Sequence, residues 1–206
     1  MKLYYAPGAC SLSPHIVARE AGIELELEKV DLKTKRTETG ADYFEINPKG
    51  SVPVLQLDNG ELLSEGPVIA QYLADLKPQS KLAPANGTLA RYRLQEALGL
   101  INSELHKSYS PLFDPSTPDT VRSARKLALL KQYTWLDQRL AKQPWLLGDE
   151  FSAADAYLFT VTNWASHVDL DLSSFSALAA FQKRVAERPF VQAAMEAEGL
   201  ISKAAA

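Results

Sequence analysis

Cys10 is the only cysteine among the 206 residues of the chain. It lies between a short apolar run and a helix that we expect to begin with Ser13 as its N-cap and Pro14 as its first residue. Unpaired N–H groups and the positive end of a helix dipole favour a thiolate at such a place. We therefore expect a reactive thiol, although a lone cysteine is more commonly a small buried apolar residue.

The spacing around Cys10 limits its redox chemistry. Ser13 occupies the Cys-x-x-Ser position where a dithiol enzyme would carry a resolving cysteine. A mixed disulfide on Cys10 would therefore need an external thiol for its release. A single cysteine also forbids an intramolecular disulfide and is typical of a reducing cytoplasm.

A second candidate segment runs from Asn47 to Val54 and carries two prolines around a glycine. Pro53 cannot donate to a strand ladder, and its preceding peptide is a candidate cis bond. Such a bond would turn the N–H and C=O of Val52 outward, where an extended peptide could pair with them. Taken alone, the segment would only be the entry to a strand.

The third candidate is Glu65, which directly precedes a helix that opens with Gly66 and Pro67. Exposed N–H groups at a helix N-terminus suit a carboxylate, and the Glu65 carboxylate suits an ammonium group. The γ-glutamyl end of glutathione carries both groups on one carbon. The plainer alternative is that Glu65 only complements the helix dipole.

The first 80 residues predict an α/β, thioredoxin-like domain with βαβ followed by ββα. Asp58-Asn59-Gly60 is a strong hairpin turn, and the last helix should bury Val68, Ile69, Tyr72 and Leu73. The expected order is strand 2–5, helix 13–21 ended by Gly22, strand 25–30, a loop with one helical turn, strands 52–57 and 61–63, and helix 66–76.

Residues 77–86 form a linker with two prolines, beyond which the strand signals vanish. We expect an all-helical domain over residues 87–206, with long helices at 89–113 and 119–140 and shorter ones after Ser152, Leu178 and Pro189. Ser152 and Asp155 have the spacing of a capping box.

The helix over 89–113 carries two neighbouring stripes. Leu94, Leu98, Ile101 and Leu105 recur at helical spacing and should face the core. Asn102, His106, Tyr109 and Phe113 form a polar and aromatic stripe beside it. His106 could donate to a sulfur held there, while the plainer interpretation is a packing histidine.

Segments 1–13, 47–54 and 64–73, in this order, resemble the glutathione-transferase superfamily, and Cys10 makes the chain most similar to the bacterial beta class. Residues 152–159 are similar to the capping motif of that superfamily's buried C-terminal helix. The resemblance implies the glutathione-transferase fold, glutathione as co-substrate, a helical domain that holds a small electrophile, and a homodimer.

The resemblance and the motifs together give the expected site. The catalytic residues would be Cys10 and His106, and Lys35 would contact the glycine carboxylate of glutathione. Beta-class relatives tend to carry asparagine where this chain has Gly99, so either that polar contact near the sulfur is absent or Asn102 supplies it from one turn further on. The glutathione contacts would be Tyr5, Ser11, Lys35, Val52, Pro53, Glu65, Gly66, Asn102, Ser103, Glu104 and Lys107, and the second-substrate pocket would be Tyr109, Phe113 and Trp164.

Composition excludes several classes of function. A net charge of −3 gives no basic surface for nucleic acid, and no apolar run approaches the roughly 20 residues that span a bilayer. The N-terminus is too polar for a signal peptide, so we expect a cytoplasmic protein. Three scattered histidines and one cysteine give no metal-ligand spacing, and no metal is expected.

Two alternatives to a transferase stay open at this stage. One is a glutathione-dependent thiol-disulfide oxidoreductase or peroxidase that works through Cys10. The other is a protein that binds apolar ligands without turnover.

Overall fold

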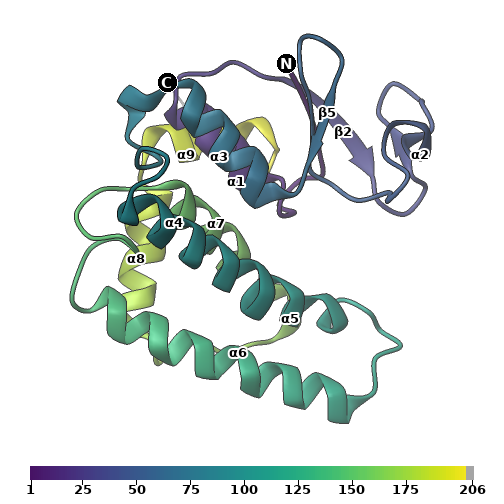
Figure 1. The fold of residues 1–206 in the computed structure, drawn as a ribbon. Coiled ribbons are helices and arrows are strands. Elements are labelled where there is room, and N and C mark those ends of the chain that lie inside the picture. Colours follow the sequence, from purple (N-terminus) through teal and green to yellow (C-terminus); the bar gives the residue numbers. More distant parts are fainter. Residues whose placement is uncertain (203–206) are drawn as a thin grey trace. The chain divides into compact units, whose positions relative to one another are not determined.

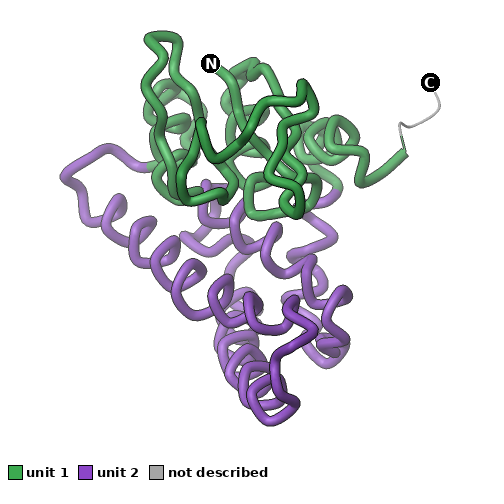
Figure 2. Tube along the Cα trace, turned by 90° about the vertical axis from the view of Figure 1, so that its right-hand side faces the viewer, with its two compact units in different colours: residues 1–83, 187–206 green, residues 84–186 purple. Residues whose placement is uncertain are grey.

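The structure of the protein, a computed structural model, describes residues 1–202. The chain forms two compact units, shown in different colours in Figure 2. Unit 1 holds residues 1–83 together with the chain from Glu187 onward, and unit 2 holds residues 84–186. We describe each unit by itself.

Unit 1 is built on a five-stranded mixed sheet with the order β3-β2-β1-β4-β5. β1 pairs in parallel with β2 and antiparallel with β4, and β4 and β5 form the predicted hairpin. The thioredoxin-like order is confirmed, with the short β3 as an addition. The strands are β1 (Lys2–Tyr5), β2 (Glu26–Asp31), β3 (Arg36–Thr37), β4 (Val54–Gln56) and β5 (Leu62–Ser64).

Helices α1 and α3 of unit 1 pack against each other, and α1 also packs against α9 (Figure 1). These helices are α1 (Leu12–Glu20), α3 (Gly66–Leu76) and α9 (Pro189–Ala197), with a 3-10 turn at Pro78–Ser80. The expected division assigned residues 87–206 to the helical domain, but in the structure the chain returns to unit 1 at Glu187. Arg188 binds Glu20 through two hydrogen bonds of 2.6 and 2.8 Å and so fixes α9 to α1.

Two local predictions in unit 1 were wrong. α1 begins at Leu12 because the N–H groups of Leu12 and Ser13 already bond to the carbonyls of Ala9 and Cys10, so Ser13 lies inside the helix and does not cap it. Val68 is 46 % exposed, since the buried face of α3 is formed by Ile69, Ala70, Leu73 and Ala74.

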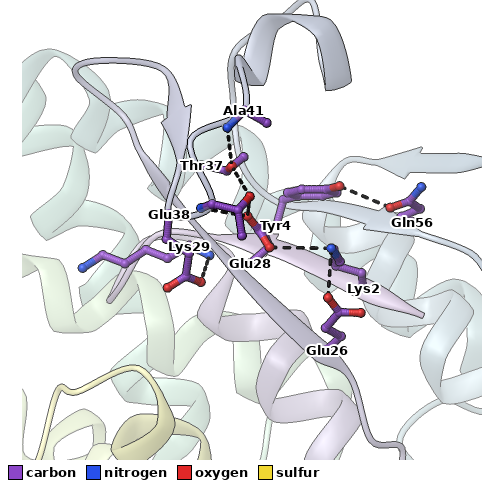
Figure 3. A network of polar contacts seen from close by, with 10 residues as sticks. Lys2, Tyr4, Glu26, Glu28, Lys29, Thr37, Glu38, Ala41 and Gln56 are labelled. Carbon is purple, nitrogen blue, oxygen red and sulfur yellow. Dashed lines mark hydrogen bonds and ion pairs between the residues drawn. The ribbon is translucent and has the colours of Figure 1, made fainter.

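The other face of the sheet carries a small core and a polar network. Tyr4, Val30, Tyr43 and Val54 belong to this core, and Tyr43 comes from the one-turn helix α2 (Tyr43–Ile46). Beside it the buried carboxylate of Glu28 faces the ammonium group of Lys2 at 3.6 Å and accepts a 2.6 Å hydrogen bond from Thr39. Figure 3 shows Lys2 lying between Glu26 and Glu28, and Tyr4 bonded to Gln56.

Unit 2 is helical. Leu94, Leu98, Ile101 and Leu105 are all buried, which confirms the predicted core stripe. Ser152 and Asp155 form the predicted capping box at the start of α7. The helices are α4 (Leu89–Leu100), a π-helical segment (Ile101–His106), α5 (Lys107–Tyr109), a 3-10 turn (Ser110–Leu112), α6 (Asp119–Leu140), α7 (Ala153–Thr162), a 3-10 turn (Asn163–Val168) and α8 (Ser176–Ala186). Within residues 1–202, no helix is long and apolar enough to cross a membrane.

Candidate active site

Cys10 lies in the loop that joins β1 to α1. Ser11 holds this loop closed, because its buried hydroxyl accepts the Ala6 N–H and donates to the Ala6 carbonyl, both at 3.2 Å. Ser11 occupies the N-cap position of α1 but makes no side-chain cap bond. Its hydroxyl is thus committed to the loop, while the partly exposed Cys10 is the side chain that the loop presents.

The Cys10 thiol lies against the proline segment of unit 1. Its Sγ donates to the Val52 carbonyl at 3.2 Å, and the Val52–Pro53 peptide is cis, as the sequence suggested. A carbonyl accepts this bond only from protonated sulfur, so ionisation of Cys10 breaks it. The Cys10 thiol therefore lies against the Val52 backbone, which was expected to pair with a peptide.

The start of α3 lies beside the same two segments. A Cβ atom added to Gly66 would be 3.6 Å from Cγ of Pro53 and 4.0 Å from the Cys10 carbonyl oxygen. Unit 1 therefore brings together Cys10, Val52, Pro53 and Gly66 from three separate stretches of the chain. Pro67 has no N–H, and Val68 and Ile69 donate theirs to the Glu65 carbonyl, so the Gly66 N–H is the candidate donor at the start of α3.

Glu65, directly before α3, has an unusual backbone. Its φ of 71° lies in the left-handed region, where a residue with a side chain is strained. Such strain is concentrated at functional sites. The exposed Glu65 carboxylate lies 3.2 Å from the Lys49 ammonium group, so the carboxylate already has one cationic partner at the surface.

Two further expected residues of unit 1 have partners within the chain. Lys35 donates from Nζ to the Gly50 carbonyl at 2.8 Å, which brings it to the loop that precedes Val52. Tyr5 is buried, and its burial raises the pKa of its hydroxyl, with further increases from the charges of Glu38 and Glu198. The Tyr5 hydroxyl is thus a neutral donor at physiological pH.

In unit 2 the π-helical segment carries the polar residues of the predicted second stripe. His106 Nδ1 lies 2.6 Å from the Tyr157 hydroxyl, which donates to the Asn102 side-chain oxygen at 3.0 Å. π-helical turns are rare and often occur at functional sites. Asn102 therefore binds the partner of His106, a role that the sequence did not indicate.

Aromatic rings surround His106 on the same unit. The Trp164 ring lies edge-on to the imidazole with centroids 4.9 Å apart, and it also contacts Tyr109 and Phe113. Tyr109 is buried and its hydroxyl bonds to that of Tyr133 at 2.9 Å, whereas Phe113 is 49 % exposed. The expected pocket residues Tyr109, Phe113 and Trp164 thus form one cluster, in which Phe113 is the most exposed.

The remaining expected residues of unit 2 lie at the surface. Ser103, Glu104 and Lys107 are exposed, and Ser103 donates to Glu104 at 3.3 Å. Gly99 is also exposed, and a Cβ atom added to it would meet nothing within 4 Å. Unit 2 therefore has space for a side chain at position 99, and crowding does not explain why glycine stands there and not asparagine.

Sequence reasoning missed two residues that contact expected site residues and a third that contacts the loop of Cys10. Tyr157 binds His106, Lys49 binds Glu65, and Glu198 accepts the N–H of Gly8 in the Cys10 loop at 3.0 Å. The first and third pairs join positions 51 and 190 apart, which no local pattern signals. Lys49 lies within the 47–54 segment, and its charge, opposite in sign to that of Glu65, was the signal that could have indicated this pair.

A metal centre finds no support in residues 1–202, which contain no group of three or more candidate ligand side chains. The polar groups described above are hydrogen-bond donors and acceptors of the backbone and the side chains, and their arrangement suits a peptide that carries a thiol.

Comparisons with known proteins agree with this chemistry. The family model described as the glutathione S-transferase N-terminal domain matches residues 8–76, and that of the C-terminal domain matches residues 100–189. The chain is 48 % identical to glutathione S-transferase GstA of Escherichia coli O157:H7, over 97 % of this chain and 100 % of that protein.

Solved structures are similar over nearly the whole chain. A sphingomonad glutathione S-transferase complexed with glutathione has a TM-score of 0.94 at 46 % identity, covering 98 % of this chain and 100 % of the other. A bacterial beta-class glutathione S-transferase of Sphingomonas chungbukensis has a TM-score of 0.94 at 47 % identity, with the same coverage.

Proposed function

Because the chain belongs to the glutathione S-transferase family, we propose that it conjugates the thiol of glutathione to small, largely apolar electrophiles. Its similarity is to the bacterial beta class. The observation that carries the proposal is the meeting of Cys10, the cis Val52–Pro53 peptide and Gly66 in unit 1.

In this proposal unit 1 binds the peptide. The backbone of Val52 pairs with the cysteinyl residue of glutathione, as an added strand would. The Gly66 N–H at the start of α3 takes the γ-glutamyl carboxylate, and the exposed Glu65 carboxylate takes its ammonium group. Lys35 is the candidate partner of the glycine carboxylate, and it would exchange the Gly50 carbonyl for that group.

Binding serves the reaction by fixing the sulfur. Positioning converts an encounter in solution into a reaction between held groups, and the thiolate is the nucleophile. It attacks an electrophilic carbon, the carbon–sulfur bond forms, and a leaving group such as halide departs with the bonding electrons. In this proposal the aromatic cluster of Tyr109, Phe113 and Trp164 supplies the apolar surface for the electrophile, and His106 supplies an imidazole that holds or accepts the thiol proton.

Thiol exchange is a second candidate activity, favoured by one observation. Cys10 is partly exposed and its sulfur contacts Val52, so a disulfide with bound glutathione is a plausible outcome of the same binding. The absence of a second cysteine means that an external thiol would have to release it.

Two further features of the proposal follow from the family. We infer that the protein forms a homodimer and that it works in the cytoplasm, where reduced glutathione is available. Sedimentation velocity tests the first inference, and a monomer at micromolar concentration would contradict it. Fractionation of the source cells tests the second, and recovery outside the cytoplasmic fraction would contradict it.

The deciding experiment measures glutathione-dependent turnover of an aryl halide and of a small mixed disulfide by the wild type and by Cys10→Ala. We expect the wild type to turn over the aryl halide. Retention of the aryl reaction with loss of the disulfide reaction in Cys10→Ala would make Cys10 a redox thiol on a transferase. A wild type that turns over neither substrate would contradict the proposed function and favour a non-catalytic binder of apolar ligands.

A further inference from the structure

The loop from Ala6 to Ser11 combines hydrogen bonds of its own with one contact from a distant part of unit 1. Ser11 ties the two ends of the loop together through Ala6. Ala9 donates its N–H to the Ala6 carbonyl at 3.0 Å and so closes a turn that contains Gly8, whose φ is 69°. The position of this turn also depends on the contact that the Gly8 N–H makes outside the loop.

Glu198, at the C-terminal end of α9, binds this turn. Its Oε2 accepts the Gly8 N–H at 3.0 Å, and the neighbouring Leu200 would lie 3.3 Å from a Cβ atom added to Gly8. The Glu198 side chain is fully buried. A buried carboxylate is costly unless its oxygens are bonded, so this contact is more than a surface pairing.

The other carboxylate oxygen has an equally buried partner. Oε1 of Glu198 lies 2.9 Å from Nδ1 of His15, whose side chain is 1 % exposed. Arg19 donates from Nε to His15 Nε2 at 3.4 Å. A guanidinium group can only donate, so Nε2 accepts and Nδ1 carries the proton that is donated to Glu198.

These bonds form a continuous relay from Arg19 through the imidazole of His15 to the Glu198 carboxylate and the Gly8 amide. The charge of the carboxylate is connected to the charge of Arg19 by hydrogen bonds, which compensates its burial. The relay lies wholly in unit 1 and joins α1, α9 and the Cys10 loop.

We propose that Glu198 is a positioning residue for the loop that carries Cys10 and that it thereby sets the affinity for glutathione. The proposal rests on the proposed function for its effect on glutathione. Its effect on the Cys10 loop is independent of any activity.

The test compares the full-length wild type with Glu198→Ala, Glu198→Gln and the control Glu196→Gln. Glu196 lies on the same helix, so its substitution removes the same charge without touching the loop. Cys10 is the only cysteine, so its alkylation by iodoacetamide reports on this loop alone. The second readout is kcat and KM for glutathione with an aryl halide.

For Glu198→Ala we expect about a tenfold higher KM for glutathione with kcat changed less than about threefold, and about a tenfold faster alkylation of Cys10. That factor corresponds to the loss of one charge-assisted hydrogen bond. Glu198→Gln should lie between wild type and Glu198→Ala, because an amide of the same size can accept from Gly8 or from His15 but not from both. If Glu198 acted through packing alone, Glu198→Gln would have the same KM for glutathione and the same alkylation rate of Cys10 as the wild type.

Amide exchange at Gly8 in the unmodified protein decides the matter if the variants fold poorly. We expect exchange at least about a hundredfold slower than in an unstructured peptide. Exchange at the unprotected rate would overturn the proposal, as would a folded Glu198→Ala with unchanged alkylation and KM. A wild type without turnover would contradict the proposed function, while alkylation and exchange would still judge the role of Glu198.

Discussion

At the scale of single residues, the proton on the Tyr157 hydroxyl determines the tautomer of the His106 imidazole. That proton is donated to Asn102, so the 2.6 Å contact with His106 requires Nδ1–H of the imidazole to be the donor. In the neutral ring Nε2 is then the acceptor. This second nitrogen is the one that the proposed function would use to accept a proton.

Replacing Tyr157 with phenylalanine removes this orientation and keeps the ring. We expect kcat with an aryl halide to fall about tenfold, which is less than the roughly hundredfold or more that a general base contributes because His106 itself is kept, while KM for glutathione changes less than about twofold. Steady-state kinetics measure both constants. Tyr92→Phe, at an exposed position of α4, is the control. An unchanged kcat in a folded Tyr157→Phe would show that the tautomer of His106 is irrelevant to the reaction.

Two glycines illustrate opposite effects of one added methyl group. Gly99 is an exposed helical position where a Cβ atom meets nothing, so Gly99→Ala should raise the free energy of unfolding by about 1 kcal/mol. Gly50 has a φ of 60°, and a Cβ atom there would lie 2.7 Å from the Phe44 ring, so Gly50→Ala should lower it by about 1–2 kcal/mol. Urea unfolding measures both. Equal effects of the two substitutions would refute the argument from backbone conformation.

At the scale of elements, periodicity predicted the helices and the hairpin well but missed local departures. The helix expected over 89–113 is continuous in direction but includes a π-helical segment, Ile101–His106. Six residues of wider turn are too few to change the spacing of the apolar stripe recognisably, so the sequence could not reveal them. β3 was missed because two residues carry no alternating pattern, and its pairing with β2 is visible only in three dimensions.

The start of α7 depends on one buried carboxylate. Asp155 accepts the N–H of Leu146 at 2.8 Å and both the N–H and hydroxyl of Ser152. Asp155→Ala leaves these buried donors without their acceptor and should lower the free energy of unfolding by about 2–4 kcal/mol. Asp155→Asn should recover only part of this loss, because its NH₂ group faces a donor. Urea unfolding tests both, and full recovery by asparagine would contradict the expected geometry.

The polar network on the sheet should make stability depend on pH. Burial alone would raise the pKa of Glu28, but hydrogen bonds from Thr39 and Thr37 and the charge of Lys2 lower it below its ordinary 4.5. A lowered pKa in the folded state stabilises the fold above about pH 4.5, and this contribution is lost as the pH falls through the folded value. Glu28→Gln should therefore destabilise at neutral pH and progressively less in acid.

Urea unfolding of wild type and Glu28→Gln between about pH 7 and pH 3 measures this difference. Glu24→Gln, at an exposed position just before β2, is the control and should show a smaller dependence on pH. A difference between wild type and Glu28→Gln that grows toward low pH would contradict the sign argued here.

At the scale of the whole chain, the sequence predicted that three segments of unit 1 lie together but not which distant residues contact them. Cys10, Val52 and Gly66 were expected to cooperate, and they meet in unit 1. The contacts of His106 with Tyr157, and of Gly8 with Glu198, join positions whose spacing carries no periodic signal. For the same reason the return of α9 to unit 1 could not be read from its helical pattern.

The ion pair between Glu20 and Arg188 joins α1 to α9, and its coupling free energy can be measured. The Glu20 side chain is 6 % exposed and binds Arg188 through two hydrogen bonds. A double-mutant cycle of Glu20→Gln and Arg188→Gln should give a coupling free energy of about 1–2 kcal/mol, because a bidentate pair with one buried partner is weakly screened. The exposed pair Arg93–Glu96, within one helix, should couple far less in the same cycle. A coupling near zero in the Glu20–Arg188 cycle would mean that this ion pair contributes nothing to holding α9 on α1, and apolar packing alone would then hold them together.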